Sequence, residues 1–297
     1  MATALLILPN FALILVGLVL ARRFRFGRDF WSGLEKLVYY VLFPALLFRS
    51  LAIAKIDFAA AAVPIAIALG FTFAGFLLSI LAGPVLGLDR KLNAAGSQCG
   101  YRFNTYVGLA VAGSLYGTPG VAMAALLLGM MIPEANLLAV AMLARHGPRG
   151  FFHELTTHPL LLASVAGLAW NAAGFGLAGF ADQTLNLLAV TALPAGLLCV
   201  GAAMRIEPGQ GSVAAHAWWL VVKLALVPAL AWAAARELGV TGLEGRILIL
   251  CAALPTATNA YILAIRMAGD GRAVATQVTI GTVISMASIP LWMAGAP

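Results

Sequence analysis

The chain has 297 residues, of which 62% are hydrophobic and only 10% are charged, and its mean hydropathy is +0.98. A soluble domain carries about 25% charged residues and cannot hide this much apolar surface in one core, so the composition excludes a soluble globular protein. The net charge of +7 does not indicate nucleic-acid binding, because the basic residues lie in short segments between apolar runs.

Ten apolar runs follow one another along the chain, and each approaches the roughly 20 residues that a spanning helix needs. The sequence therefore predicts an all-α membrane protein of ten transmembrane helices in a single membrane domain, residues 1–297. The first half supplies residues 3–21, 34–53, 59–81, 92–116 and 121–144. The second half supplies residues 159–175, 184–204, 214–236, 246–267 and 273–293.

Lysine and arginine in the connecting loops predict the orientation, because short cytoplasmic loops are enriched in positive charge. Ten basic residues follow odd-numbered helices and three follow even-numbered ones. We therefore expect the odd-numbered loops in the cytoplasm and both termini outside, in the inner (plasma) membrane. The first run has no basic residue before it, so we expect a retained helix rather than a cleaved signal peptide.

The two halves of the chain share a register over two successive helices. The matching pairs, all 150 residues apart, are Pro9 and Pro159, Gly17 and Gly167, Pro44 and Pro194, and Leu47 and Leu197. These matches predict two repeats, residues 1–148 and 149–297. Each repeat has five helices, an odd number, so the second copy would be inverted in the membrane, as in many secondary transporters.

Two polar islands interrupt the fourth and ninth helices, at corresponding places in the two halves. A broken backbone at this depth must be covered by protein or line a cavity. The free N–H groups where the second half of a broken helix begins favour an anion such as a carboxylate. The predicted substrate-binding residues are Asn104, Thr105, Gly108, Pro255, Thr256, Thr258 and Asn259. The alternative is that these side chains only cap kinks and join helices.

Charged residues inside the spans are expensive and indicate either function or ion pairs. Glu134, which follows Pro133 in the fifth helix, either carries a coupling proton or pairs with Arg102, and the sequence leaves both open. Lys223 is expected to extend its ammonium group to the membrane surface, and Arg49 to lie at the interface.

No metal or cofactor site is predicted. His153 and His158 resemble a zinc-protease pair, but a separation of five residues places them on different helix faces. The chain has no phosphate-binding loop, dinucleotide fingerprint or nucleophile elbow, so an ion gradient or the substrate gradient is the expected energy source.

The polar islands and their surroundings resemble the auxin efflux carrier family over essentially the whole chain. The matching stretches are residues 102–109, Tyr116-Gly117, residues 254–264, Gly269-Asp270 and Pro290-Leu-Trp292. The resemblance implies two inverted five-helix repeats with crossing, broken helices four and nine. It also implies a scaffold of helices one, two, six and seven beside a moving transport domain, organic anions as substrates and, commonly, homodimers.

One residue departs from the family pattern. Ala110 stands where the family often has a proline, in Gly108-Leu109-Ala110. Without that proline, the break in the fourth helix is expected to depend on Asn104, Gly108 and Gly113.

We therefore expect a secondary transporter, not an enzyme, that moves a small organic anion across the lipid bilayer by alternating access. Coupling to protons or sodium stays open. A sodium symporter of the bile-acid type is the alternative within transport, because Asn, Thr and Glu134 oxygens could bind the ion. An intramembrane enzyme or sensor is the alternative of another class, but the spans show no metal or nucleophile constellation.

Overall fold

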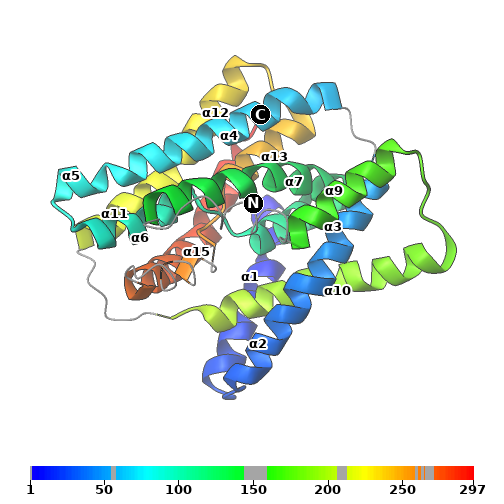
Figure 1. Cartoon of the computed structure of the whole chain (residues 1–297), viewed down its shortest axis with the longest axis horizontal. Helices are drawn as coiled ribbons and strands as arrows, with labels where there is room; N and C mark the ends of the chain where they lie inside the picture. Colours follow the sequence, from blue (N-terminus) through cyan, green and yellow to red (C-terminus); the bar gives the residue numbers. More distant parts are fainter. Residues whose placement is uncertain are drawn as a thin grey trace. The chain divides into compact units, whose positions relative to one another are not determined.

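The computed structural model describes residues 2–54, 58–143, 159–205, 213–257, 260, 261, 264 and 271–297. Within these residues the regular structure is helical, without a strand, which confirms the all-α prediction (Figure 1). The chain forms two compact units, and each draws on both halves of the sequence. Unit 1 comprises Met1–Phe58, Tyr106–Gly129 and Phe152–Ala203, and unit 2 comprises Ala59–Thr105, Met130–Phe151 and Met204–Pro297.

Unit 1 contains the helices that the family resemblance assigns to the scaffold, together with the first part of α7. α1 packs against α10, and α3 packs against both α9 and α10. Its elements are α1 (Ala2–Arg22), α2 (Arg28–Leu37), the π-helical turn η1 (Val38–Leu42), α3 (Phe43–Ala52), α9 (Pro159–Ala172), α10 (Gly179–Ala203) and residues 106–129 of α7 (Thr105–Leu143).

Glycine lets two pairs of helices in unit 1 meet backbone to backbone. A Cβ atom at Gly17 of α1 would collide with the carbonyl oxygen of Leu198 in α10. A Cβ atom at Gly167 of α9 would collide with the carbonyl oxygen of Phe48 in α3. Gly167 lies 150 positions after Gly17, and Leu198 lies 150 positions after Phe48. The same glycine-to-carbonyl contact therefore occurs twice, with the two halves of the chain in exchanged roles. Small residues at such positions allow the close van der Waals packing on which helix association in lipid depends.

A side chain of α9 satisfies the end of α3. The Nδ2 atom of Asn171 donates to the carbonyl oxygens of Leu51, Ala52 and Ala54, at 3.0, 3.1 and 2.7 Å. The last carbonyl groups of a helix have no partner within the helix. Asn171 therefore joins α9 to α3 at the end of that helix.

Unit 2 is centred on Trp219, which is fully buried. Its indole ring lies against Gly96, where a side chain would collide with the ring, and its Nε1 donates to the Ser79 carbonyl at 3.3 Å. The elements of unit 2 are α4 (Phe58–Ile80, from Ala59 onward), α5 (Ala82–Leu86), α6 (Arg90–Tyr101), residues 130–143 of α7, α11 (Val213–Val221), the π-helical turn η2 (Val222–Leu226), α12 (Val227–Glu237), α13 (Gly242–Ala253) and α15 (Gly271–Ala294).

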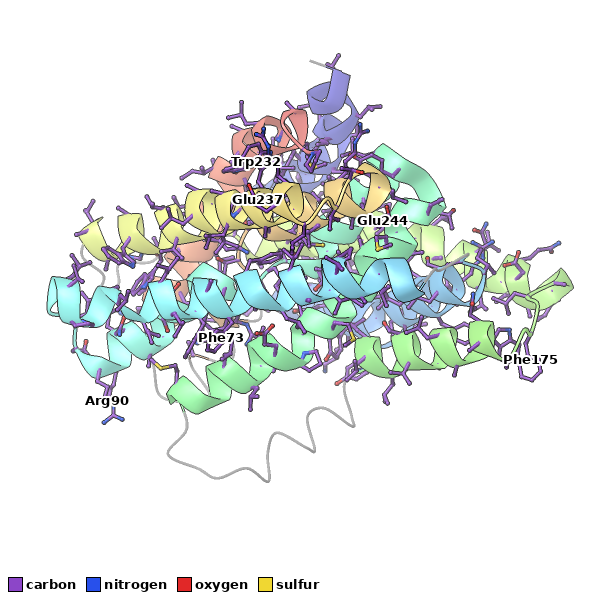
Figure 2. The ribbon with its side chains drawn as sticks, turned by 90° about the horizontal axis from the view of Figure 1, so that it is seen from above. Phe73, Arg90, Phe175, Trp232, Glu237 and Glu244 are labelled. Carbon is purple, nitrogen blue, oxygen red and sulfur yellow. The ribbon has the colours of Figure 1, made fainter. Side chains whose placement is uncertain are left out.

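The start of α6 is fixed by local sequence. Gly87 ends α5 with a left-handed backbone (φ 64°), which glycine adopts without strain. Asp89 then caps α6, because its Oδ1 accepts from the N–H groups of Lys91 and Leu92 at 2.8 and 3.2 Å. Arg90, the first residue of α6, projects away from the ribbon (Figure 2). A polar, capped turn thus separates two apolar stretches.

A wide π-helical turn precedes a proline in each unit. η1 leads into α3, whose second residue is Pro44, and η2 leads into α12, whose second residue is Pro228. Proline has no N–H group, and its ring collides with the preceding turn of an α-helix. A widened turn of five residues accommodates the ring without ending the helix.

Six helices in the described part of the chain are long and apolar enough to cross a membrane. They lie at Leu5–Arg22, Ala61–Leu86, Arg90–Ala139, Gly179–Ala203, Val213–Glu237 and Gly271–Ala294. Large apolar side chains are exposed along them, such as Leu8 (60%) and Val190 (58%). Such surfaces are stable in lipid and not in water, so this is a multi-pass membrane protein.

The boundary between the fourth and fifth predicted helices lies where the sequence placed it. Two helices meet within α7 (Thr105–Leu143) at a kink, where Gly117 is non-helical (φ 60°, ψ −151°), and Gly117 falls between the predicted ends at residues 116 and 121. The break itself lies upstream, at residues 102–104. Gly108 and Gly113 are both helical, so the expectation that they share in the break is wrong. Ala110 is buried in regular helix, where proline would disrupt a hydrogen bond.

Candidate functional site

Two helices of unit 2 end in the same way. α6 and α13 have 12 residues each, and each is followed by an extended residue. Arg102 has φ −71° and ψ 150°, and Leu254 has φ −61° and ψ 142°. Pro255 explains the second end, because the residue before proline avoids the helical region. At the first end Asn104 directly precedes α7, and asparagine is favoured at that position.

The two segments that follow these helices are hydrogen-bonded to each other within unit 2. The backbone N–H of Asn104 donates to the Pro255 carbonyl at 2.8 Å. The Oγ1 of Thr256 donates to the Cys99 carbonyl, in the last turn of α6, at 2.7 Å. Broken backbone inside a membrane protein is stable only when its polar groups find such partners. Each break therefore stabilises the other.

The predicted site residues of unit 2 are deeply buried. Asn104 is 3% exposed, Thr256 2% and Arg102 6%, and Pro255 is also buried. Thr105 is half-buried and opens α7. The structure thus brings Asn104 and Pro255 together, as the sequence predicted from the two polar islands.

Two further predicted residues, Gly108 and Glu134, lie within α7. Gly108 is buried in α7 within unit 1. Glu134 is half-buried in unit 2, and its Oε2 is buried with no hydrogen-bond partner among the described residues. Its pairing with Arg102 stays a prediction. Thr258 and Asn259 lie outside the described residues, as do both histidines, 153 and 158, of the zinc-like motif.

Lys223 does not extend to the membrane surface, so that expectation is wrong. The residue lies in η2 and is 2% exposed, and its Nζ donates to the Ala252 carbonyl at 3.4 Å. Ala252 stands in the last turn of α13, where the helix dipole is negative. The wide turn places a buried lysine beside the second break, and the local sequence carries no signal for this contact.

Unit 1 contains a cavity of about 420 Å³ between α1, α3, α7 and α10. Its polar lining residues are Asn10, Arg49, Ser50, Ser114, Thr118 and Asn186. The Nδ2 of Asn10 donates to the Ser114 Oγ at 2.9 Å, which links α1 to α7. The sequence carries no signal for this cavity, because its lining residues are scattered over four helices.

Arg49 forms an ion pair within unit 1, and its expected place at the membrane interface stays a prediction. Its Nε donates to Asp182 Oδ1 at 2.7 Å, and its Nη2 donates to Oδ2 at 3.2 Å. The pair joins α3 to α10. Among the described residues, no three His, Cys, Asp or Glu side chains gather as a metal site would require.

Residues 3–147 and 149–293 match the model of a protein family described as membrane transport protein. The chain belongs to this family. The match confirms the resemblance to the auxin efflux carriers seen in the sequence. A membrane transport protein requires several spanning helices, in agreement with the apolar helices described above.

Two relatives are similar to this membrane transport protein over nearly its whole length. A Rhizobium meliloti (strain 1021) protein described as "Putative malonate transporter" is 25% identical, over 96% of this chain and 92% of its own. A protein from Methanothermobacter thermautotrophicus described as "Uncharacterized transporter" is 25% identical, over 96% of each chain.

Proposed function

We propose that this membrane transport protein is a secondary transporter that moves a small carboxylate across the inner membrane by alternating access. Its family supports transport, and the name of the Rhizobium relative supports a dicarboxylate of malonate size. The observation that supports the proposed site is the hydrogen bond from the Asn104 N–H to the Pro255 carbonyl, at 2.8 Å. It joins two interrupted helices, the arrangement with which transporters bind substrate near the bilayer midplane.

The proposed architecture is ten spans in two inverted repeats, residues 1–148 and 149–297, with the fourth and ninth spans broken and crossing. Two features of the first half recur in the second half about 150 residues later, and they support this architecture. The Gly17 and Gly167 contacts differ by 150 positions, and α6 and α13 differ by 152. A repeated contact is stronger support than repeated letters, because packing depends on shape and not on composition.

The chemistry of the breaks favours an anion. α7 begins at Thr105, so its first N–H groups lie at the break, where the helix dipole is positive. The Asn104 side chain adds hydrogen-bonding groups at the same place. Thr105, Gly108, Thr256, Thr258 and Asn259 complete the proposed set, and Arg102 and Glu134 are proposed as coupling residues or an ion pair.

Ligand binding in detergent tests the substrate class. Potassium malonate, succinate and acetate would be titrated while thermal unfolding is followed, with and without sodium chloride. A ligand at 100 times its Kd stabilises the folded state by about 2.7 kcal/mol, so even millimolar binders are detectable. We expect malonate to raise the unfolding temperature. If no carboxylate raises it, the proposed substrate class is wrong; a requirement for sodium would instead favour the symporter.

Replacing Asn104 by alanine is expected to weaken malonate binding and uptake roughly tenfold. One lost hydrogen bond to a ligand is worth about 1–1.5 kcal/mol, which is about a factor of ten. Uptake into proteoliposomes and the titration above measure the effect. Asn136→Ala is the matched control, because Asn136 is half-buried on α7 in unit 2. Equal binding by both variants would remove Asn104 from the site.

The proposed orientation places the loop after α1 in the cytoplasm and the loop after α9 outside. Phe24 and Phe175 lie in these loops and are 66% and 59% exposed, and Phe175 projects from its loop (Figure 2). A Phe175→Cys variant should react with an impermeant maleimide added to intact cells, whereas Phe24→Cys should react only after lysis. The native cysteines are buried, which keeps the background low. The reverse pattern would invert the topology.

A further inference from the structure

We propose that the cavity of unit 1 is a carboxylate-binding site in which the Arg49 guanidinium receives the anion and Asp182 competes with it. The proposal rests on the proposed function, and it adds a binding site separate from the helix breaks of unit 2.

The size of the cavity suits a small organic acid. Its volume of about 420 Å³ falls within the range of roughly 300–1,000 Å³ that is usual for small-molecule sites. Its described lining residues all belong to unit 1. Apolar side chains such as Leu13, Leu46 and Val121 also line it, and they lower the local dielectric constant around a charge.

The charge of the cavity suits an anion. Among the described residues that line it, Arg49 is the one with a charged side chain. A charged side chain in an apolar span is expensive and in most cases serves a pathway or a partner. The planar guanidinium offers five N–H donors in a fork that matches a carboxylate, whereas a lysine would offer only a point charge.

Asp182 shows that this guanidinium is oriented to bind a carboxylate. Its two oxygens accept from Arg49 Nε and Nη2, in the two-point geometry of strong carboxylate recognition. Asp182 does not line the cavity, and its side chain is 31% exposed against 18% for Arg49. The ion pair with Asp182 therefore occupies one edge of the Arg49 guanidinium. Arg49 also lines the cavity, which Asp182 does not.

A second polar group in the cavity would suit the far end of a dicarboxylate. The Nδ2 of Asn10 and the Oγ of Ser114 bond to each other across the cavity wall, and Asn186 lines the same space. These side chains offer N–H and O–H donors without a second charge. A dicarboxylate would thus bind with one carboxylate at Arg49 and the other near Asn10.

The competing explanation is that Arg49 and Asp182 only tie α3 to α10. Three variants separate the two explanations: Asp182→Asn, Arg49→Gln, and the double variant. Each is compared with its parent in an Asn104→Ala background, which weakens the proposed site at the helix breaks, and the Kd of potassium malonate is measured by titration against thermal unfolding. Asp182→Asn keeps the shape of the side chain and removes the competing charge.

A carboxylate site predicts opposite effects for the two single variants. Asp182→Asn should tighten malonate binding three- to tenfold, and Arg49→Gln should weaken it at least tenfold. The double variant should bind as weakly as Arg49→Gln, although its two neutral amides can still pair. Arg49→Lys should fall between, because it keeps the charge without the fork.

A structural ion pair predicts another pattern. The Kd would then be the same in the parent, Asp182→Asn and the double variant, and that result would overturn the inference while leaving the proposed function intact. If Arg49→Gln does not fold, Asp182→Asn alone decides, since unchanged or weaker binding contradicts a competing carboxylate. If the wild type binds no carboxylate, the proposed function and this inference both fail.

Discussion

Alanine at Gly17 or at Gly167 is expected to destabilise the protein by about 3 kcal/mol, and by a similar amount at each position. The added Cβ would collide with a backbone carbonyl oxygen, that of Leu198 or of Phe48, which cannot rotate away as a side chain can. The helices must then separate, and overpacking of this kind costs about 1–3 kcal/mol or more. Thermal unfolding in detergent should show a midpoint lower by roughly 6–12 °C.

Gly70→Ala provides the matched control for these variants. Gly70 lies on α4, where an added Cβ meets nothing within 4 Å. Alanine is favoured over glycine in a helix by about 0.5–1 kcal/mol, so this variant should be slightly more stable than wild type. If Gly17→Ala unfolded at the same temperature as Gly70→Ala, that result would contradict the backbone contact. Unequal losses at Gly17 and Gly167 would weaken the case for repeats.

Replacing Thr256 by valine is expected to reduce uptake by about one to two orders of magnitude. Valine has nearly the same shape but no hydroxyl, so the buried Cys99 carbonyl loses the donor that lies 2.7 Å away. An unsatisfied buried polar group costs about 1–3 kcal/mol, which corresponds to roughly a tenfold to hundredfold change in an equilibrium. This bond joins the segment after α13 to the end of α6. Its loss should therefore displace the backbone at both helix breaks.

Two further threonine variants control this experiment. Thr256→Ser keeps a hydroxyl and should retain most of the activity. Thr191 also donates from its hydroxyl to a backbone carbonyl, that of Leu187 at 2.8 Å, but it is exposed on α10 and the bond stays within one helix. Thr191→Val should therefore transport like wild type. Uptake per folded transporter is the measurement, and normal uptake by Thr256→Val would show that the bond is dispensable.

Much of the architecture could be predicted because its signals are compositional or local. Long apolar runs gave the helices and the membrane class, and the polar residues inside them marked the fourth and ninth helices as interrupted. Pro255 is a local signal, since it restricts Leu254 whatever the rest of the chain does. The repeats and the orientation were predicted in the same way and stay predictions.

The position of the first break was harder to predict. Glycine weakens a helix by only about 1 kcal/mol, and packing can compensate for that, so Gly108 and Gly113 remain helical. The break at residues 102–104 is stabilised by the Pro255 carbonyl, which lies about half the chain away in sequence. Such a partner leaves no mark on the local sequence.

By itself, the sequence determined that this protein is helical, lies in a membrane and belongs to a transport family, because composition and motifs carry that information residue by residue. Only the tertiary structure decided which polar groups meet. Arg49 pairs with a carboxylate 133 residues away, and Lys223 is buried against the end of α13 instead of reaching the surface. In an apolar interior each charge or open carbonyl must find a partner, and the packing of helices, not the order of residues, determines which partner is within reach.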